Sequence, residues 1–309
     1  MSLVVTVTFN PAIDISCTVD TVAPDAKLRA GEVRREPGGG GINVARVVHR
    51  LGGDVEALYL AGGPTGDMLE KLLSDEEVPQ RRVPVEGTTR ESLTVHEASS
   101  TRQYRFVMSG APLRQEEWEQ GLAQAIGDGS GPAYLVASGS LPPQAPTTLY
   151  ATLAKRARQA GIRAVVDTSG EPLRAATQAG VFLLKPNLRE LGHLAGRELR
   201  DEADIEGVCR GLVEAGRATV VVTSLGAGGV ILVAEGITDH IPTPTVPVRS
   251  KIGAGDSMVA GIVFGLAQGR DVPQAVRLGI AAGAAAVTTP GTNLCTGEDT
   301  LRLYHQMAQ

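Results

Sequence analysis

The chain has 309 residues, of which 42% are hydrophobic and 20% charged, and its formal net charge is −5 at pH 7. This balance excludes a disordered chain, the lack of a Lys/Arg-rich run argues against a nucleic-acid partner, and no apolar run approaches the roughly 18 residues of a membrane span. Glycine is the unusual residue, because 38 of 309 positions are glycine, about 12% against an average of roughly 7%.

Residues 3–9 follow the start of the chain as an alternating apolar run, which predicts a first strand and not a signal peptide. The three cysteines, Cys17, Cys209 and Cys295, are odd in number and far apart. That spacing favours neither a disulfide framework nor a zinc site, and it predicts a protein of the reducing cytoplasm.

The rest of the chain alternates short apolar runs with helical patterns. The runs are nearly continuous hydrophobics, as expected of parallel strands covered on both faces, and they lie at residues 57–61, 133–137, 162–167, 181–185, 219–224 and 230–234. Between them, apolar or small residues recur at helical spacing, as at 44, 47, 48 and 51 and at 276, 280, 283 and 287. This order predicts a doubly wound, mostly parallel α/β sheet flanked by helices. The length fits two domains or one large α/β domain, and we expect one domain spanning residues 1–309.

Two stretches, at about 11–36 and 88–109, break the rhythm, because they carry mixed polar patterns without a helix. We expect them to form one small β-sheet that stands off the main sheet as a lid, with residues 92–108 forming a β-hairpin that turns at SST. Exposed apolar residues such as Val107 and Met108 predict a homodimer formed through the lids. Lys27, Arg90 and Arg105 lie on these stretches and are either solvated cations or, for the two arginines, a clamp for a phosphate.

The sequence GGGGINVAR, at residues 38–46, runs four glycines into an amphipathic helix. Glycines allow the backbone to approach a ligand, and a helix start offers free N–H groups and a partial positive charge. Asn43 lies one step off the apolar stripe, where its amide can point at a sugar hydroxyl. A purely structural Gly-rich turn is an equally good interpretation of this segment taken alone.

Two further motifs each follow an apolar run, KPNLRE at residues 185–190 and TSLGAGG at residues 223–229. In the first, Asn187 and Glu190 have the spacing of a helix capping box, which is the better interpretation of that motif alone. The alternative is that both face nucleotide phosphates and hold Mg²⁺ through water. The second motif is a Gly-rich loop at the carboxyl end of a strand, where α/β folds bind ligands.

The last motif, GAGD at residues 253–256, enters a helix rich in small residues. The N–H groups of Ala254, Gly255 and Asp256 predict an anion cradle. Asp256 is either a carboxylate that caps the helix or a general base that takes a proton from an attacking hydroxyl beside a phosphate. Motifs of P-loop NTPases, of dinucleotide-binding first units and of protein kinases are absent from the sequence.

Together, GGGGINVAR, KPNLRE and GAGD resemble the motifs of the ribokinase-like (PfkB) sugar kinases, and the resemblance covers essentially the whole chain. Within that family, segments such as SGSLPP, VDTSGE and IGAGDSM are most similar to the minor-type ATP-dependent 6-phosphofructokinases. The resemblance implies a ribokinase-like fold. It also implies transfer of a phosphoryl group from ATP with Mg²⁺ to the 1-hydroxyl of fructose 6-phosphate, which gives fructose 1,6-bisphosphate and ADP in glycolysis.

The resemblance also implies roles for individual residues. Asp256 would be the general base, and the amides of Gly253, Ala254 and Gly255 would stabilise the charge of the transferred group. Asp14, Gly39, Asn43 and Ser140 would contact the sugar and Arg90 and Arg105 its 6-phosphate, whereas Lys27, Lys185, Asn187, Ser224, Gly226 and Gly229 would line the ATP site and Glu190 would order Mg²⁺. A monovalent cation, K⁺, would lie near Ser250, Ile252, Ala286, Gly291 and Asn293.

Several alternatives stay open. Related 1-phosphofructokinases and tagatose-6-phosphate kinases usually carry Lys where this chain has Gly40, which favours fructose 6-phosphate as the substrate. Many members carry Asp where this chain has Ser250, so the cation site departs from the family pattern. A non-catalytic sugar or nucleotide sensor on the same fold is a more remote alternative, because a sensor need not keep a base such as Asp256. A dehydrogenase is also a remote alternative.

Overall fold

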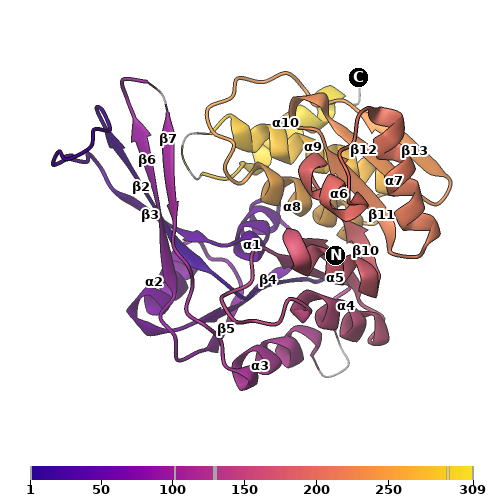
Figure 1. The fold of residues 1–309 in the computed structure, drawn as a ribbon, viewed down its shortest axis with the longest axis horizontal. Helices are drawn as coiled ribbons and strands as arrows, with labels where there is room; N and C mark the ends of the chain where they lie inside the picture. The colour runs from indigo at the N-terminus through magenta and orange to yellow at the C-terminus, as the bar shows by residue number, and fades with distance from the viewer. Residues whose placement is uncertain (1, 101, 128–130, 290, 292, 308–309) are drawn as a thin grey trace.

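A large sheet and a small sheet organise the computed structural model, which describes residues 2–100, 102–127, 131–289, 291 and 293–307 (Figure 1). The large sheet has the strand order β13 (Ile237–Ile241), β12 (Val230–Ala234), β11 (Ala218–Ser224), β10 (Val181–Leu184), β9 (Arg163–Asp167), β8 (Tyr134–Ser138), β1 (Val4–Thr8), β4 (Val55–Ala61) and β5 (Gln80–Pro84). All neighbours from β5 to β11 are parallel, and only β12 and β13 pair antiparallel. The predicted doubly wound, mostly parallel sheet is confirmed.

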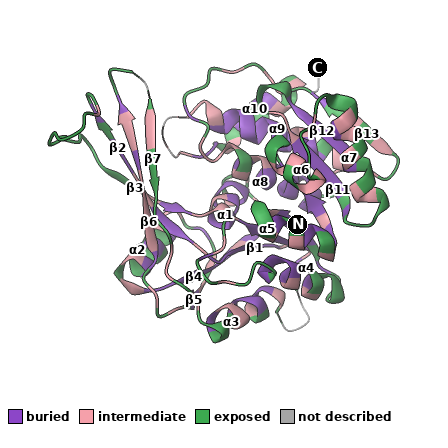
Figure 2. Ribbon diagram, viewed as in Figure 1, coloured by how far each residue is buried: buried purple, intermediate pink, exposed green. Residues whose placement is uncertain are grey.

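Helices cover both faces of this sheet, and each strand buries side chains on both sides. Val4 of β1 belongs to one apolar core and the adjacent Val5 to the other, as the two-residue period of a strand requires. The first core is completed by α1 (Gly40–Arg50), α2 (Gly63–Asp75), α8 (Ala254–Ala267), α9 (Val272–Val287) and α10 (Gly297–Met307), and the second by α3 (Gln115–Ile126), α4 (Leu149–Gln159), α5 (Gly170–Ala179), α6 (Leu188–Ala195) and α7 (Glu202–Glu214). In Figure 2 the strands of the large sheet are mostly buried between these layers.

The small residues of α8 allow it to pack tightly on α9. A Cβ on Gly261 would lie 2.7 Å from the carbonyl oxygen of Leu278, so a larger residue there would push the two helices apart. The GAGD motif forms the start of α8, and this packing therefore fixes its position relative to the rest of the sheet. Within the described residues, no helix is both long and apolar enough to cross a membrane.

The small sheet has the strand order β3 (Arg34–Gly38), β2 (Ala12–Val19), β6 (Arg90–Glu97) and β7 (Gln103–Val107). It arises from the two stretches that interrupt the α/β rhythm, although β3 runs two residues past the expected boundary at 36. Strands β6 and β7 pair antiparallel with Leu93 opposite Phe106, which confirms the predicted hairpin. Figure 1 shows this sheet projecting away from the large one.

A buried arginine ties the small sheet to the large one. Arg46 of α1 is 2% exposed, and its Nη1 donates a hydrogen bond to the carbonyl of Pro37 in β3 at 2.9 Å. Its Nε and Nη2 donate to the two carboxylate oxygens of Glu76 at 3.0 and 2.5 Å, directly after α2. Helices α1 and α2 and strand β3 therefore meet at one guanidinium.

Candidate active site

The two glycine-rich helix starts meet at one hydrogen bond. Asn43 in the first turn of α1 donates its Nδ2–H to Oδ2 of Asp256 in the first turn of α8, at 2.9 Å. The two residues are 213 positions apart in the chain. This contact brings the GGGGINVAR and GAGD motifs together, beside the carboxyl ends of the parallel strands.

Asp256 has the acid–base property that a general base requires. Its pKa is raised to about 7, mainly by burial and also by the negative charge of Asp167, whereas the Asn43 hydrogen bond and the Lys185 cation act in the opposite direction. A base works best when its pKa lies near the operating pH. The environment of Asp256 therefore favours proton transfer over simple helix capping.

A buried lysine lies beside the same helix start. Lys185 follows β10, and its Nζ is 3.3 Å from Oδ1 of Asp167 at the end of β9. Burial opposes its charge, but Asp167 and Glu190 outweigh burial and raise the pKa of Lys185. The ammonium lies 3.6 Å from the position of a Cβ on Gly255, so a fixed cation borders the GAGD amides. No motif pointed to a role for Asp167, although its place at a strand's carboxyl end is a usable signal.

The capping interpretation of KPNLRE is confirmed. Asn187 Oδ1 accepts from the backbone N–H of Glu190, and Glu190 Oε2 accepts from that of Asn187, both at 2.9 Å. The same segment also touches the second Gly-rich loop, because the N–H of Ser224 donates to the carbonyl of Pro186 at 3.0 Å. The structure thus places the two predicted nucleotide-side loops next to each other.

On the other side, residues predicted to bind sugar gather around Asn10. The backbone carbonyl of Asn10 accepts from Nε and Nη2 of Arg90 at 3.3 and 3.2 Å, and its side-chain amide donates to Ser140 Oγ at 3.2 Å. The carboxylate of Asp14 lies directly against Gly38, because a Cβ on Gly38 would overlap with it. Burial raises the pKa of Asp14, and Arg90 and Arg105 oppose that rise. Asn10 itself belongs to no motif, so sequence analysis missed it.

The glycines at the start of α1 are needed for close approach. A Cβ on Gly40 would lie 2.8 Å from the backbone nitrogen of Gly139, next to Ser140. Gly39 has a φ of +116°, which favours glycine. The structural and the ligand-binding interpretations of this segment are therefore compatible, because the tight turn is what presents the helix start.

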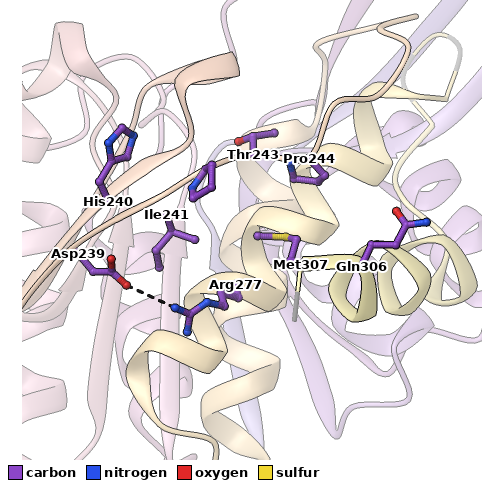
Figure 3. A pocket seen from close by; sticks show the side chains of 9 residues that line it. Asp239, His240, Ile241, Thr243, Pro244, Arg277, Gln306 and Met307 are labelled. Carbon is purple, nitrogen blue, oxygen red and sulfur yellow. Dashed lines mark hydrogen bonds and ion pairs between the residues drawn. The ribbon is translucent and has the colours of Figure 1, made fainter. Parts of the chain in front are cut away.

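The short helix η1 (Gly226–Gly228), which forms the second Gly-rich loop, rests on β13 and the residues after it. His240 donates from Nε2 to the carbonyl of Gly228 at 2.8 Å, and Thr243 donates to that of Gly226 at 3.4 Å. A cavity of about 380 Å³ lies beside this support (Figure 3) and is lined by Asp239, His240, Ile241, Pro242, Thr243, Pro244, Arg277, Gln306 and Met307. Strand β13 was not predicted from the sequence, because this edge strand is partly exposed and polar.

We expect His240→Phe to raise the KM for ATP by about 3–10-fold, since one hydrogen bond that holds the loop is lost. The KM for the sugar substrate is expected to stay unchanged. Asp239→Asn is the matched control, because Asp239 leaves the opposite side of β13 toward Arg277 (Figure 3) and ion-pairs with it at 3.5 Å. Steady-state kinetics with each substrate varied in turn would check this. Equal KM values for ATP in both variants would contradict it.

Lys27 and the residues of the predicted cation region are less closely joined to the site described above. Lys27 lies exposed in the loop between β2 and β3. Among the described residues, no hydrogen bond or ion pair joins it to Lys185, Asn187 or Ser224. In the predicted cation region, the N–H of Ser250 donates to the carbonyl of Val287 at 3.3 Å. Thr289 Oγ1 lies within hydrogen-bond distance of the carbonyls of Ala286 and Asn293, at 2.7 and 2.6 Å. These contacts bring Ser250, Ala286 and Asn293 into one compact region. In the sequence, Ile252 lies two positions after Ser250 and Gly291 two positions before Asn293.

Residues 3–299 match the model of the pfkB family carbohydrate kinases. The chain belongs to this family. It is 44% identical over 306 residues, 99% of this chain and 90% of the relative, to ATP-dependent 6-phosphofructokinase isozyme 2 of Mycobacterium tuberculosis. It is 41% identical, with 100% of both chains covered, to the isozyme of the same name from Escherichia coli.

Solved structures of Escherichia coli phosphofructokinase-2 superpose on the whole pfkB-family chain. Those in complex with potassium and with fructose-6-phosphate each give a TM-score of 0.95 at 41% identity and cover 100% of both chains. A third, of the tetrameric inhibited form, gives 0.94 at 40% identity with the same coverage. This pfkB-family chain is a phosphotransferase with a ribokinase-like fold, and the family implies ATP and a divalent metal ion.

Proposed function

We propose that this pfkB-family kinase transfers the γ-phosphoryl group of ATP to the 1-hydroxyl of fructose 6-phosphate, forming fructose 1,6-bisphosphate and ADP. The Asn43–Asp256 hydrogen bond carries the proposal, because it joins the sugar-side helix to a base at an anion cradle. Relatives named 6-phosphofructokinase are 41–44% identical to the chain, whereas relatives named 1-phosphofructokinase are 30–34% identical. That difference favours fructose 6-phosphate over fructose 1-phosphate.

The chain's own residues supply a consistent reaction path. Asp256 accepts the proton of the sugar hydroxyl while the hydroxyl oxygen bonds to the γ-phosphorus. The bond between that phosphorus and the ADP oxygen breaks in the same step. The amides of Gly253, Ala254 and Gly255 face the charge that spreads over the transferred group, and Lys185 adds a fixed positive charge beside them. Phosphoryl transfer depends mainly on such positioning and charge neutralisation.

We propose Mg²⁺ as the divalent ion, with Glu190 ordering it through water. Within the described residues no group of three or more His, Cys, Asp or Glu side chains could hold a metal by itself. That fits Mg²⁺, which usually takes one or two carboxylates together with substrate phosphates and waters. When bound, the ion neutralises phosphate charge. We also propose a K⁺ site in the region of Ser250, Ala286 and Asn293, with Ile252 and Gly291 taking part. The Escherichia coli relative has a structure with potassium.

An assay of ADP release with a panel of acceptors tests the substrate proposal. We expect the highest kcat/KM with fructose 6-phosphate, lower values with fructose 1-phosphate and tagatose 6-phosphate, and the lowest with unphosphorylated sugars. A preference for fructose 1-phosphate or tagatose 6-phosphate would overturn the substrate assignment. No ADP release with any sugar would support the sensor alternative.

Replacing Arg90 or Arg105 with Ala is expected to raise the KM for fructose 6-phosphate by about 10-fold or more, because a hydrogen bond to a charged group contributes about 1.5–3 kcal/mol. ATP affinity should be spared, since both arginines lie on the small sheet, close to Asp14. Arg102→Ala, an exposed arginine just before β7, is the control. Initial rates at varied concentrations of each substrate provide the measurement. An unchanged KM in either variant would remove that arginine from the phosphate clamp.

We propose that the whole chain forms one domain, with the small sheet as its lid, and that two copies pair through their lids. Phe106 and Val107 of edge strand β7 and the following Met108 are 54%, 63% and 49% exposed, and an unpaired apolar edge favours association. Light scattering should show twice the chain mass of 32.1 kDa. Phe106→Glu should shift this toward the monomer, and Leu301→Glu on α10 should not. A wild-type monomer at every concentration and ligand state would refute the dimer.

The same proposal places the enzyme in the cytoplasm, where its substrates are made and consumed. All three cysteines are buried free thiols, as expected in a reducing compartment.

A further inference from the structure

The carbonyl oxygen of Gly139 is held by two hydroxyl groups. Tyr150 of α4 donates from Oη at 3.1 Å, and Thr168, directly after β9, donates from Oγ1 at 2.9 Å. Both side chains are buried, Tyr150 fully. The N–H of Gly139 donates to the carbonyl of Asp167 at 3.0 Å. Three hydrogen bonds thus hold both backbone polar groups of Gly139, directly after β8.

Gly139 lies against the sugar side of the site. Gly139 has a φ of +106°, so the chain turns sharply there, and the next residue is Ser140, whose Oγ accepts from Asn10. The start of α1 packs on the same turn, because a Cβ on Gly40 would lie 2.8 Å from the nitrogen of Gly139. A shift of Gly139 would therefore move Ser140 and the helix start that carries Asn43.

Packing alone does not require the hydroxyl of Tyr150, because a phenylalanine would keep the same ring contact. Its ring packs edge-on against Phe9 at 5.8 Å between ring centroids, which needs no hydroxyl. A buried hydroxyl loses its bonds to water, and Gly139 supplies the hydrogen bond that compensates. The polar atom is thus explained by the turn that it holds.

We propose that Tyr150 and Thr168 are positioning residues that set the affinity for the sugar substrate by locking the Gly139 carbonyl. The inference rests on the proposed role of Ser140 and the α1 start in sugar binding. Neither hydroxyl would touch the substrate. Their effect would pass through the turn, and the nucleotide side would be spared.

The test compares Tyr150→Phe, Thr168→Val and the double variant with the wild-type enzyme. We expect each single variant to raise the KM for fructose 6-phosphate by about 3-fold and the double variant by about 10-fold or more, because the double variant leaves the Gly139 acceptor without either hydroxyl. The KM for ATP should change by less than about 2-fold. Thr168→Ser keeps a hydroxyl and should restore the wild-type KM.

Tyr59→Phe is the matched control. Tyr59 is also fully buried, and its hydroxyl donates to Gln80 Oε1 at 2.5 Å, between β4 and β5 and away from the turn. It should lower the melting temperature without changing either KM. If Tyr150→Phe does not fold, Thr168→Val and Thr168→Ser decide the question alone.

Equal rises in the KM for fructose 6-phosphate and for ATP, or an unchanged KM in the double variant, would overturn the inference. Failure of the proposed function would look different, because the wild-type enzyme itself would then release no ADP with fructose 6-phosphate.

Discussion

Asp256→Asn is expected to lower kcat by about 10²–10⁴-fold, the usual contribution of a general base. Asparagine has nearly the same shape as aspartate and can keep the contact with Asn43, but it cannot accept the proton of the sugar hydroxyl. Binding of fructose 6-phosphate, measured by calorimetry, should therefore stay close to that of the wild type. Turnover would be followed by ADP release.

Asp271→Asn controls for the loss of a carboxylate at a helix start, because Asp271 caps α9 by accepting from the N–H of Gln274 at 2.8 Å and asparagine caps equally well. It should retain wild-type kcat. Near-wild-type turnover in Asp256→Asn would refute the assignment of the base.

The pH dependence follows from the same carboxyl group. Burial raises the pKa of Asp256 to about 7, so kcat/KM should fall about tenfold per pH unit below that value as the base becomes protonated. The raised pKa also means that the folded state holds this proton more tightly than the unfolded chain. Its contribution to stability is present at low pH and is lost as pH rises toward 7. Asp256→Asn should thus raise the melting temperature at pH 8, and this gain should shrink toward pH 4.

Arg46→Met is expected to destabilise the protein by about 3–5 kcal/mol, because it leaves the Glu76 carboxylate without its closest cation and the Pro37 carbonyl without its donor. The guanidinium makes three hydrogen bonds at 2.5–3.0 Å and is 2% exposed. Chemical denaturation followed by circular dichroism would measure the free energy of unfolding. We also expect a higher KM for the sugar, because the small sheet loses its anchor on α1.

Arg50→Met is the matched control for this variant. Arg50 donates to the same Glu76 carboxylate at 3.1 Å but is partly exposed, so its loss should cost about 1 kcal/mol or less. The double variant Arg46→Met, Glu76→Leu should recover part of the lost stability, because it removes the carboxylate that Arg46→Met leaves without its closest cation. Equal effects of Arg46→Met and Arg50→Met would contradict the role of Arg46 as a buried anchor.

Local patterns were enough to predict most of the large sheet and the hairpin of the small one. The strands that sequence analysis missed, β5 and β13, are the two edges of the large sheet. Edge strands are buried on fewer sides, and so β5 keeps Arg81 and Arg82, and β13 keeps Asp239 and His240, which hide the apolar pattern.

Most candidate-site residues that could be predicted lie in motifs, whereas Arg90 and Arg105 were predicted from their place on the small sheet. Asn43, Lys185 and Asp256 sit at glycine-rich or proline-marked turns at the edge of the sheet, and those turns carry a sequence signal. Asn10 and Tyr150 act through contacts that form only when the chain is folded, and no spacing in the sequence encodes a bond between positions 139 and 150 or 10 and 140. Such positioning contacts can be identified only in the folded structure.

The identity of the product tests the central claim most directly. Fructose 6-phosphate, ATP and Mg²⁺ would be incubated with the enzyme and the mixture followed by ³¹P NMR. The account predicts a new phosphate ester on carbon 1 of the sugar that appears at the same rate as ADP and is nearly absent with Asp256→Asn. ADP that forms without this ester, or an ester on another carbon, would contradict it.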